Sequence, residues 1–289
     1  MLVHIKKILA KAQKGRFAIG AFNTSNLEVT LGIVRAAVKK KSPVIIQISE
    51  STIRYAGLKD IVAIIKSVAE TEGKNIKIAM HLDHGKDWEI IKACVLAGLS
   101  SVHCDASAYP FEKNISLTKR AAEFAHRNNV YCKGELGSLL GKEGLTVARI
   151  PKNSDKYMTD PTRVREFVSR TGIDALAISV GAMHGFFPGR ENIDFKRLKK
   201  IQLAVPKIPL VLHGASGVPA NQIKKAVKLC VRIINIDTDL RIAFTKKLKK
   251  TIKTSPRKSF DPRKILSHSI DAVTQAVEKI ILVAGSGLK

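Results

Sequence analysis

The chain has 289 residues, and 45% of them are hydrophobic, which is enough apolar material for a sizeable buried core. It carries 50 Lys and Arg against 24 Asp and Glu, a formal net charge of +26. No apolar run approaches the roughly 18 residues of a membrane span. Residues 1–16 are amphipathic and have no signal-peptide pattern, so we expect a soluble, cytoplasmic protein.

Short β-rich runs recur along the chain, and longer segments with helical periodicity separate them. The runs, in order, are FAIGAFN, PVIIQIS, IKIAMHLDH, SVHCDAS, VYCKGELG, ALAISVG, PLVLHGAS and RIINIDT. The helical segments include 58–69, 87–97, 115–128, 162–171, 219–230 and 240–250. Eight strands that alternate with helices predict an α/β fold, a (β/α)8 TIM barrel. We expect one domain over residues 1–289.

Two segments depart from this alternation. Residues 138–160 lack periodicity, and a long loop inside a compact barrel is usually functional or mobile. An extra C-terminal helix is predicted from about residue 265 to residue 283.

The basic residues are spread along the chain, mostly at helical spacing beside apolar positions. Aromatic residues make up only 5%, and no stacking motif of the RNA-binding kind is visible. The pattern favours a solvated Lys-rich surface over a specific nucleic-acid site. The positive electrostatic field of such a surface would still steer an anionic substrate toward the protein.

Polar residues gather at one end of the predicted strands. They are Asn23, Ser49, Asp83, His84, Asp105, Ser107, Glu135, His184, His213, Ser216, Asn235, Asp237 and Thr238. All of them lie at or just past the C-terminal end of a strand. In a closed barrel these ends meet on the face where barrel enzymes place their chemistry.

Three histidines, His84, His184 and His213, each follow an apolar strand. Three imidazoles that converge from separate strands can bind Zn²⁺ and leave one position open for substrate. Co²⁺ or Mn²⁺ would also suit such a site. The histidines in helical or surface contexts are interpreted as structural: His4, His126 and His268. Two histidines within predicted strands stay undecided: His81 and His103.

Two glycine- and hydroxyl-containing turns follow the last two predicted strands. HGASGVP and NIDTD each end a strand and open a helix. Backbone N–H groups at a helix N-terminus bind phosphate well. The loops after strands seven and eight form a phosphate site in many barrel enzymes, so we expect one here.

The motifs AFN, LDHG, DAS, PFEKNI, ELG, TGIDALA, LHGASG, NIDTD and DPRK occur in this order. In their order and spacing, over nearly the whole chain, they resemble the class II (zinc-dependent) fructose-bisphosphate aldolases and the related tagatose-bisphosphate aldolases. The resemblance implies reversible aldol cleavage of fructose 1,6-bisphosphate to dihydroxyacetone phosphate and glyceraldehyde 3-phosphate, a step of glycolysis and gluconeogenesis. Tagatose 1,6-bisphosphate is the alternative substrate.

The resemblance also implies roles for individual residues. The zinc ligands would be His84, His184 and His213, and Glu135 would approach the metal in some states. Asp83 would exchange a proton with the C4 hydroxyl, and Glu143, in the segment after ELG, would move protons at the ketose carbon. The implied substrate-binding residues are Asn23, Ser49, Gly185, Gly214, Ala215, Ser216, Asn235, Ile236, Asp237, Thr238 and Arg263.

Assembly and ions follow from the same resemblance. In some members a neighbouring subunit contributes the arginine that corresponds to Arg263, and we expect a homodimer or homotetramer. One zinc ion per site is expected. Whether a monovalent cation binds beside it is left open.

Three positions depart from the pattern of many relatives. Ala108 replaces a common histidine, Lys142 stands where some members carry an acidic residue, and Pro188 stands where a lysine is usual. These changes leave the sugar preference open. A binding or adhesion protein that kept the barrel and uses its basic surface on anionic polymers is the alternative of another class. The retained Asp83 and Glu143 argue against it.

Overall fold

The computed structural model describes residues 1–138, 141–146, 154–182, 184–186, 192–254 and 260–287. Its centre is a closed barrel of eight parallel strands in the order β1-β10-β9-β7-β5-β4-β3-β2. The strands are β1 (Ile19–Asn23), β2 (Val44–Ser49), β3 (Ile78–Gly85), β4 (Ser101–Cys104), β5 (Tyr131–Leu136), β7 (Ala175–Ile178), β9 (Leu210–Leu212) and β10 (Val231–Ile236). The predicted eight-stranded barrel is therefore confirmed.

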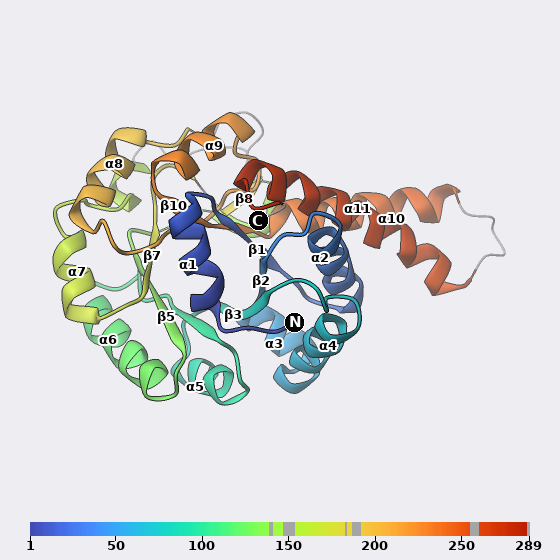
Figure 1. Ribbon diagram of the computed structural model, residues 1–289, viewed down its shortest axis with the longest axis horizontal. Coiled ribbons are helices and arrows are strands. Elements are labelled where there is room, and N and C mark those ends of the chain that lie inside the picture. The colour runs from blue at the N-terminus through green and yellow to red at the C-terminus, as the bar shows by residue number, and fades with distance from the viewer. Residues whose placement is uncertain (139–140, 147–153, 183, 187–191, 255–259, 288–289) are drawn as a thin grey trace.

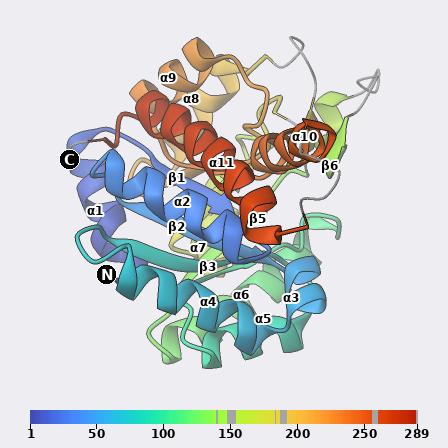
Figure 2. The same ribbon diagram turned by 90° about the vertical axis from the view of Figure 1, so that its right-hand side faces the viewer.

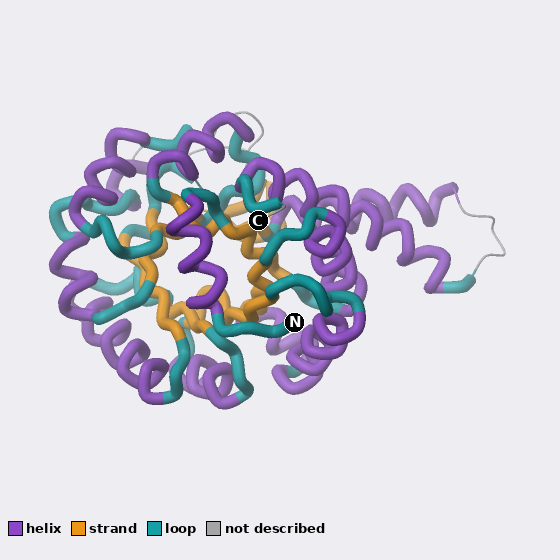
Figure 3. Tube along the Cα trace, in the orientation of Figure 1, coloured by secondary structure: helices purple, strands orange, loops and turns teal. Residues whose placement is uncertain are grey.

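Helices surround the barrel, as Figures 1 and 3 show in the same orientation. They are α2 (Leu27–Lys39), α3 (Glu50–Ala56), α4 (Leu58–Thr71), α5 (Trp88–Leu96), α6 (Phe111–Arg127), α7 (Val164–Thr171), α8 (Phe195–Ala204), α9 (Ala220–Leu229), α10 (Thr238–Thr254) and α11 (Pro262–Ala284). None of the helices within the described ranges combines the length and apolar character that a bilayer crossing requires.

Side-chain caps fix where several of these helices begin. Asn26 accepts a hydrogen bond from the Val29 amide at the start of α2 (2.9 Å), and Asp87 and Asp194 cap α5 and α8 in the same way. Each cap satisfies an amide that has no partner inside the helix. The helices therefore start directly after the strand-end loops that carry polar residues.

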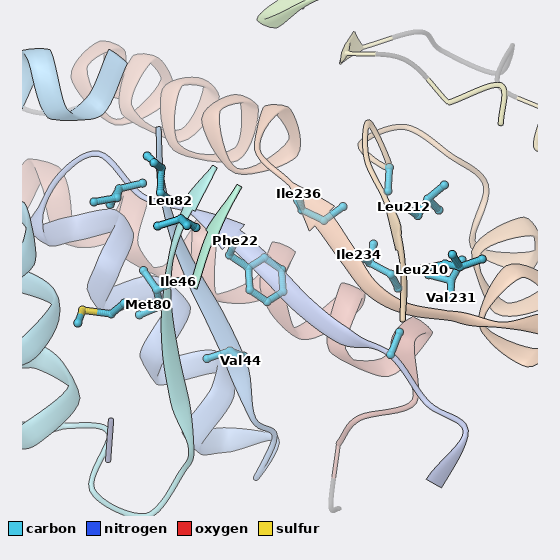
Figure 4. Close-up of a cluster of buried hydrophobic side chains, with 14 of the residues drawn as sticks. Phe22, Val44, Ile46, Met80, Leu82, Leu210, Leu212, Val231, Ile234 and Ile236 are labelled. Atoms are coloured by element: carbon cyan, nitrogen blue, oxygen red, sulfur yellow. The ribbon is translucent and has the colours of Figure 1, made fainter. Parts of the chain in front are cut away.

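The outward side chains of the strands form the main core with the surrounding helices. Phe22, Ile46, Leu82, Leu212 and Ile236 are at most 1% exposed, and Figure 4 shows them on neighbouring strands. Because every strand of a parallel barrel is covered by helices, its outward side reads as an apolar run.

A second core fills one end of the barrel interior. Helix α1 (Ile5–Gly15) lies across this end, as seen near the centre of Figure 1. Its residues Ile5, Ile8 and Leu9 are buried against the inward side chains of Ile45 and Ile233. Helix α1 contacts β1, β3 and β10. The end beyond the C-termini of the strands is thus left for polar side chains.

The segment 138–160 differs from the aperiodic loop that the sequence predicts. It contains β6 (Gly141–Thr146) and a 3₁₀ turn, η1 (Ser154–Tyr157). β6 pairs in parallel with β8 (His184–Phe186), which follows α7 and β7 in the chain. The prediction was wrong here because a pairing partner so distant in sequence leaves no local turn signal.

The predicted extra C-terminal helix is α11. It packs against α2 and α10 (Figure 2), and α10 and α11 extend side by side away from the barrel (Figure 1). Asp261 caps α11 through a hydrogen bond from the amide of Arg263 (3.0 Å).

Candidate metal and catalytic site

Ionisable side chains cluster where β3, β4, β5 and β9 end. Two overlapping groups have ligand atoms within 4.8 Å of one another: Asp83, His84, His103 and His213, and then His84, Asp105 and Glu135. His84 belongs to both groups. Imidazole nitrogen and carboxylate oxygen are the donors that Zn²⁺ accepts in catalytic sites.

The backbone of His84 turns at the end of β3. Its φ is +47°, a left-handed conformation that few residues other than glycine adopt, and the β3–β4 register is irregular between Leu82 and Gly85. Adjacent residues of a regular strand point to opposite sides of the sheet. The turn removes this restriction, so Asp83 and His84 both face the cluster.

The two ring nitrogens of His84 contact different partners. Nδ1 lies 2.7 Å from Oδ2 of Asp105, and Nε2 lies 2.9 Å from Nδ1 of His213. Burial opposes the charged form of His84, but the charge of Asp83 and the hydrogen bond to Asp105 outweigh it and raise the pKa of His84 to about 10. A carboxylate that orients an imidazole in this way is typical of metal-binding histidines.

Amide groups hold both oxygens of Asp83. Asn23 donates to Oδ2 and Asn235 donates to Oδ1, each over 3.1 Å, and Gln47 lies 3.4 Å from Oδ2. The Lys133 ammonium is 3.5 Å from Oδ1. Burial raises the pKa of Asp83, but the positive charges of His84 and Lys133 lower it by more. The pKa of Asp83 therefore lies well below the usual value. Asp83 is therefore a fixed, ionised carboxylate.

Lys133 and Glu135 are two positions apart on β5, so their side chains share a face, and both are buried inside the barrel. Lys133 donates to Nε2 of His213 over 3.0 Å. Burial lowers the pKa of Lys133, and the charges of Asp83 and Glu135 oppose this shift. Burial, with the charge of Asp105, raises the pKa of Glu135 to about 8.

Glu135 also has a buried oxygen that the described residues do not satisfy. Its Oε2 lies 3.4 Å from Nε2 of His103 and 3.8 Å from Nδ1 of His84, and it has no hydrogen-bond partner among the described residues. Buried polar atoms are nearly always paired. This oxygen beside two imidazoles is consistent with a bound cation.

Some of the predicted substrate-binding residues lie in this network and others beside it. Asn23 and Asn235 bind Asp83 directly. Ser49 caps α3 and contacts Ser51 over 2.7 Å. Ser216 accepts a hydrogen bond from the Asp239 amide at the start of α10 (3.2 Å).

The turn after β9 and the start of α10 contain the residues that the sequence predicts to bind a phosphate. Gly214 has φ +62°, which a residue with a side chain rarely adopts. Asp237 binds Arg241 (2.8 Å), Thr238 opens α10, and Ala215 is buried. Ile236 instead points outward into the core with the helices (Figure 4).

Three predicted residues cannot be compared with the cluster, and a fourth lies away from it. His184 and Gly185 lie on β8 and Glu143 lies on β6, but their side chains fall outside the described part of the chain. Arg263 lies in the first turn of α11, and its guanidinium binds Asp261 over 3.0 Å.

Two buried residues of the site, Lys133 and Gln47, are absent from the sequence prediction, and a third, His103, is left undecided there. A period-two signal could have found them, because His103 precedes Asp105 by two residues and Lys133 precedes Glu135 by two. Alternate residues of a strand share a face. A polar residue two positions before a predicted site residue therefore points into the same barrel.

Comparisons with known proteins agree with this geometry. The family model described as "Fructose-bisphosphate aldolase class-II" matches residues 3–289. The chain belongs to this family. It is 40% identical to a fructose-bisphosphate aldolase of Geobacillus stearothermophilus over 277 residues, which cover 96% of this chain and 94% of that protein. It is 38% identical to a probable fructose-bisphosphate aldolase of Bacillus subtilis (strain 168), with coverage of 96% and 95%.

Solved structures of aldolases have the same fold. The YdjI aldolase from Escherichia coli K12 superposes with a TM-score of 0.86 at 32% identity, covering 100% of this chain and 99% of that one. A putative fructose-1,6-bisphosphate aldolase from Coccidioides immitis gives a TM-score of 0.85 at 29% identity, covering 99% and 97%. The protein is thus an enzyme of the class II aldolase type. Class II aldolases are generally metal-dependent, and the His/Asp cluster supplies suitable donors.

Proposed function

We propose that this class II aldolase catalyses the zinc-dependent, reversible cleavage of fructose 1,6-bisphosphate to dihydroxyacetone phosphate and glyceraldehyde 3-phosphate, in glycolysis and gluconeogenesis. The observation that carries the proposal is the 2.9 Å approach of His84 Nε2 to His213 Nδ1 beside the fixed carboxylate of Asp83. Two imidazoles from different strands with a neighbouring ionised carboxylate suit a metal-assisted proton transfer. We further propose that residues 1–289 act as one domain.

We assign the metal to His84, His213 and His184, with Glu135 as an additional donor. The buried oxygen of Glu135 and the paired imidazoles supply nitrogen and oxygen ligands, which fit Zn²⁺. A divalent ion held there would act as a Lewis acid on the ketose oxygens. A monovalent cation is not needed for this assignment.

We assign Asp83 to the proton of the C4 hydroxyl. Its oxygens are held by Asn23 and Asn235, so the carboxylate keeps one orientation while it accepts the proton during cleavage and returns it during condensation. We propose that Glu143 exchanges a proton with the ketose carbon whose C–C bond is cleaved. Together the two carboxylates would serve the two proton transfers of the reaction.

We propose that the two phosphates bind at two separate sets of strand ends, after β9 and β10 and after β2. The turn at 214–216 and the start of α10 would hold the dihydroxyacetone phosphate part, because backbone amides at a helix N-terminus favour anions. Ser49 at the start of α3 would contact the other phosphate. Arg263 is proposed to reach a phosphate of a second copy, in a cytoplasmic homodimer or homotetramer.

A kinetic comparison of fructose and tagatose 1,6-bisphosphates tests the substrate assignment. We expect a higher kcat/KM for the fructose sugar, and complete loss of cleavage of both sugars in EDTA. A higher value for tagatose 1,6-bisphosphate would reassign the sugar and keep the aldol chemistry.

Borohydride reduction in the presence of dihydroxyacetone phosphate separates the two aldolase mechanisms. Lys133 is a buried lysine within the site, and a Schiff base there would be trapped as a stable adduct. We expect no adduct on Lys133. An adduct, with cleavage that persists in EDTA, would replace the metal-dependent mechanism with a Schiff-base one.

A further inference from the structure

The backbone amide of His84 needs a hydrogen-bond acceptor that the strand ladder does not supply. The register of β3 and β4 is irregular between Leu82 and Gly85, so His84 lies where the ladder is interrupted. A buried backbone N–H without an acceptor costs about as much as a lost hydrogen bond. Here the acceptor is a side chain: the His84 amide donates to Nδ1 of His103 over 3.2 Å.

This hydrogen bond fixes the tautomer of His103. A neutral imidazole has one N–H and one acceptor nitrogen, so an Nδ1 that accepts a proton places the ring hydrogen on Nε2. Nε2 lies 3.4 Å from Oε2 of Glu135. His103 therefore directs an N–H toward the Glu135 carboxylate, although the separation exceeds that of a well-formed hydrogen bond.

The same tautomer decides whether His103 is a metal ligand. Its ring centroid lies 4.8 Å from that of His84 and 5.2 Å from that of His213, so by proximity it could be counted as a third imidazole donor. However, Nδ1 is occupied by the His84 amide, and Nε2 carries the hydrogen. Neither nitrogen offers a lone pair to an ion.

We propose that His103 is a positioning residue of the metal site, which holds the left-handed backbone of His84 through its amide and presents Nε2–H to Glu135. The inference rests on the proposed function, because it requires a divalent ion at His84 and His213. Left-handed backbone in a residue with a side chain is costly and persists only where neighbouring contacts hold it. His103 supplies such a contact from inside the barrel, where it is fully buried.

Two variants of nearly equal shape test the amide contact. Asn in place of His103 keeps an oxygen acceptor near the position of Nδ1, whereas Leu has the same branching and no acceptor. His103→Leu should weaken Co²⁺ binding by about 10- to 100-fold, the scale seen when partners of metal ligands are removed, and should change the visible Co²⁺ spectrum. His103→Asn should keep most of the affinity and a spectrum close to that of the wild type.

His81→Leu is the matched control, because it removes another buried imidazole that contacts Ser101 over 2.8 Å. It should leave the Co²⁺ spectrum unchanged. Equal losses in His103→Leu and His103→Asn, or wild-type affinity in His103→Leu, would overturn the positioning role. If wild-type protein and His84→Ala bound Co²⁺ equally, the proposed metal site itself would fail, which is a different result.

A measurement on the wild-type protein keeps the inference testable if a variant does not fold. The ¹⁵N shifts of the His103 ring should show the proton on Nε2, both in metal-free and in zinc-loaded protein. A proton on Nδ1, or a ring shift that indicates direct zinc ligation, would contradict the inference.

Discussion

Asp83 and His84 are neighbours in sequence, yet each has a distinct set of partners. Asp83 is held by amides of Asn23 and Asn235, whereas His84 contacts Asp105 and His213 through its ring. This separation would allow Asp83 to transfer protons and His84 to bind an ion, as proposed above. It depends on the left-handed backbone of His84, which lets both side chains face the barrel mouth.

Asp83→Asn should retain zinc and lose turnover. The amide has nearly the shape of the carboxylate but is not a base, and loss of a general acid–base group typically costs about 10²-fold or more in rate. Zinc content by metal analysis and kcat for fructose 1,6-bisphosphate measure the two effects. Asp271→Asn, an exposed carboxylate on α11, is the control and should match the wild type. Cleavage by Asp83→Asn at the wild-type rate would refute the role.

At the scale of elements, α1 and the strand ends divide the barrel interior into an apolar and a polar end. Ile8 of α1 is completely buried in the second core, with Ile19, Ala79 and Val211 of the barrel. The ionisable cluster lies at the strand ends beyond this core. Stability and metal binding should therefore respond to different substitutions.

Ile8→Ala should lower the free energy of unfolding by about 2 to 5 kcal/mol, because it leaves a cavity beneath the barrel. Zinc affinity should not change. Denaturant unfolding of zinc-free protein and a zinc competition assay measure the two quantities. Lys11→Ala, at an exposed position of the same helix, should change stability by less than about 0.5 kcal/mol. A variant that loses zinc affinity in proportion to stability would contradict the separation.

For the molecule as a whole, the net charge of +26 suits an anionic substrate. Raising salt from about 0.05 to about 0.5 M should lower kcat/KM where encounter is limiting and leave kcat nearly unchanged, because screening weakens long-range steering. Steady-state kinetics over this salt range measure the effect. Salt-resistant, sequence-selective DNA binding would instead indicate a second site on the basic surface.

The buried histidines should also make the metal-free protein sensitive to acid. Burial lowers the pKa of His81, His103 and His213 below 6.5, so below that pH the unfolded chain takes up protons that the folded chain does not. Glu135 has the opposite effect. Its pKa in the folded protein is raised to about 8, so the folded carboxyl group holds one proton that the unfolded carboxylate lacks. His84 also opposes the effect of the buried histidines near pH 6.5, where the unfolded imidazole is only half protonated and the folded one is fully protonated, but it adds no slope well below that pH.

The melting temperature of EDTA-treated protein should therefore fall from pH 6.5 to pH 5. Thermal unfolding at intermediate pH values measures this slope. A melting temperature that stays constant or rises over the same range would show that these histidines are protonated in the folded state.

The sequence predicts the barrel well because strand and helix periods are local properties. It also places Asp83, His84 and His213 correctly at strand ends, where polar residues interrupt apolar runs. It does not predict that His84 adopts φ +47° or that His103 accepts its amide, because both depend on the β3–β4 register. The sequence does not predict β6 either, because this strand forms by pairing with β8, a distant segment of the chain.

Adding zinc back to metal-stripped protein tests the central claim most directly. After chelation the protein should not cleave fructose 1,6-bisphosphate, and activity should return in proportion to added Zn²⁺ until one ion is bound per chain. His213→Ala, which lacks one proposed ligand, should not recover over the same titration. Full cleavage by the chelated protein, or no cleavage by the fully zinc-loaded wild type, would contradict the account.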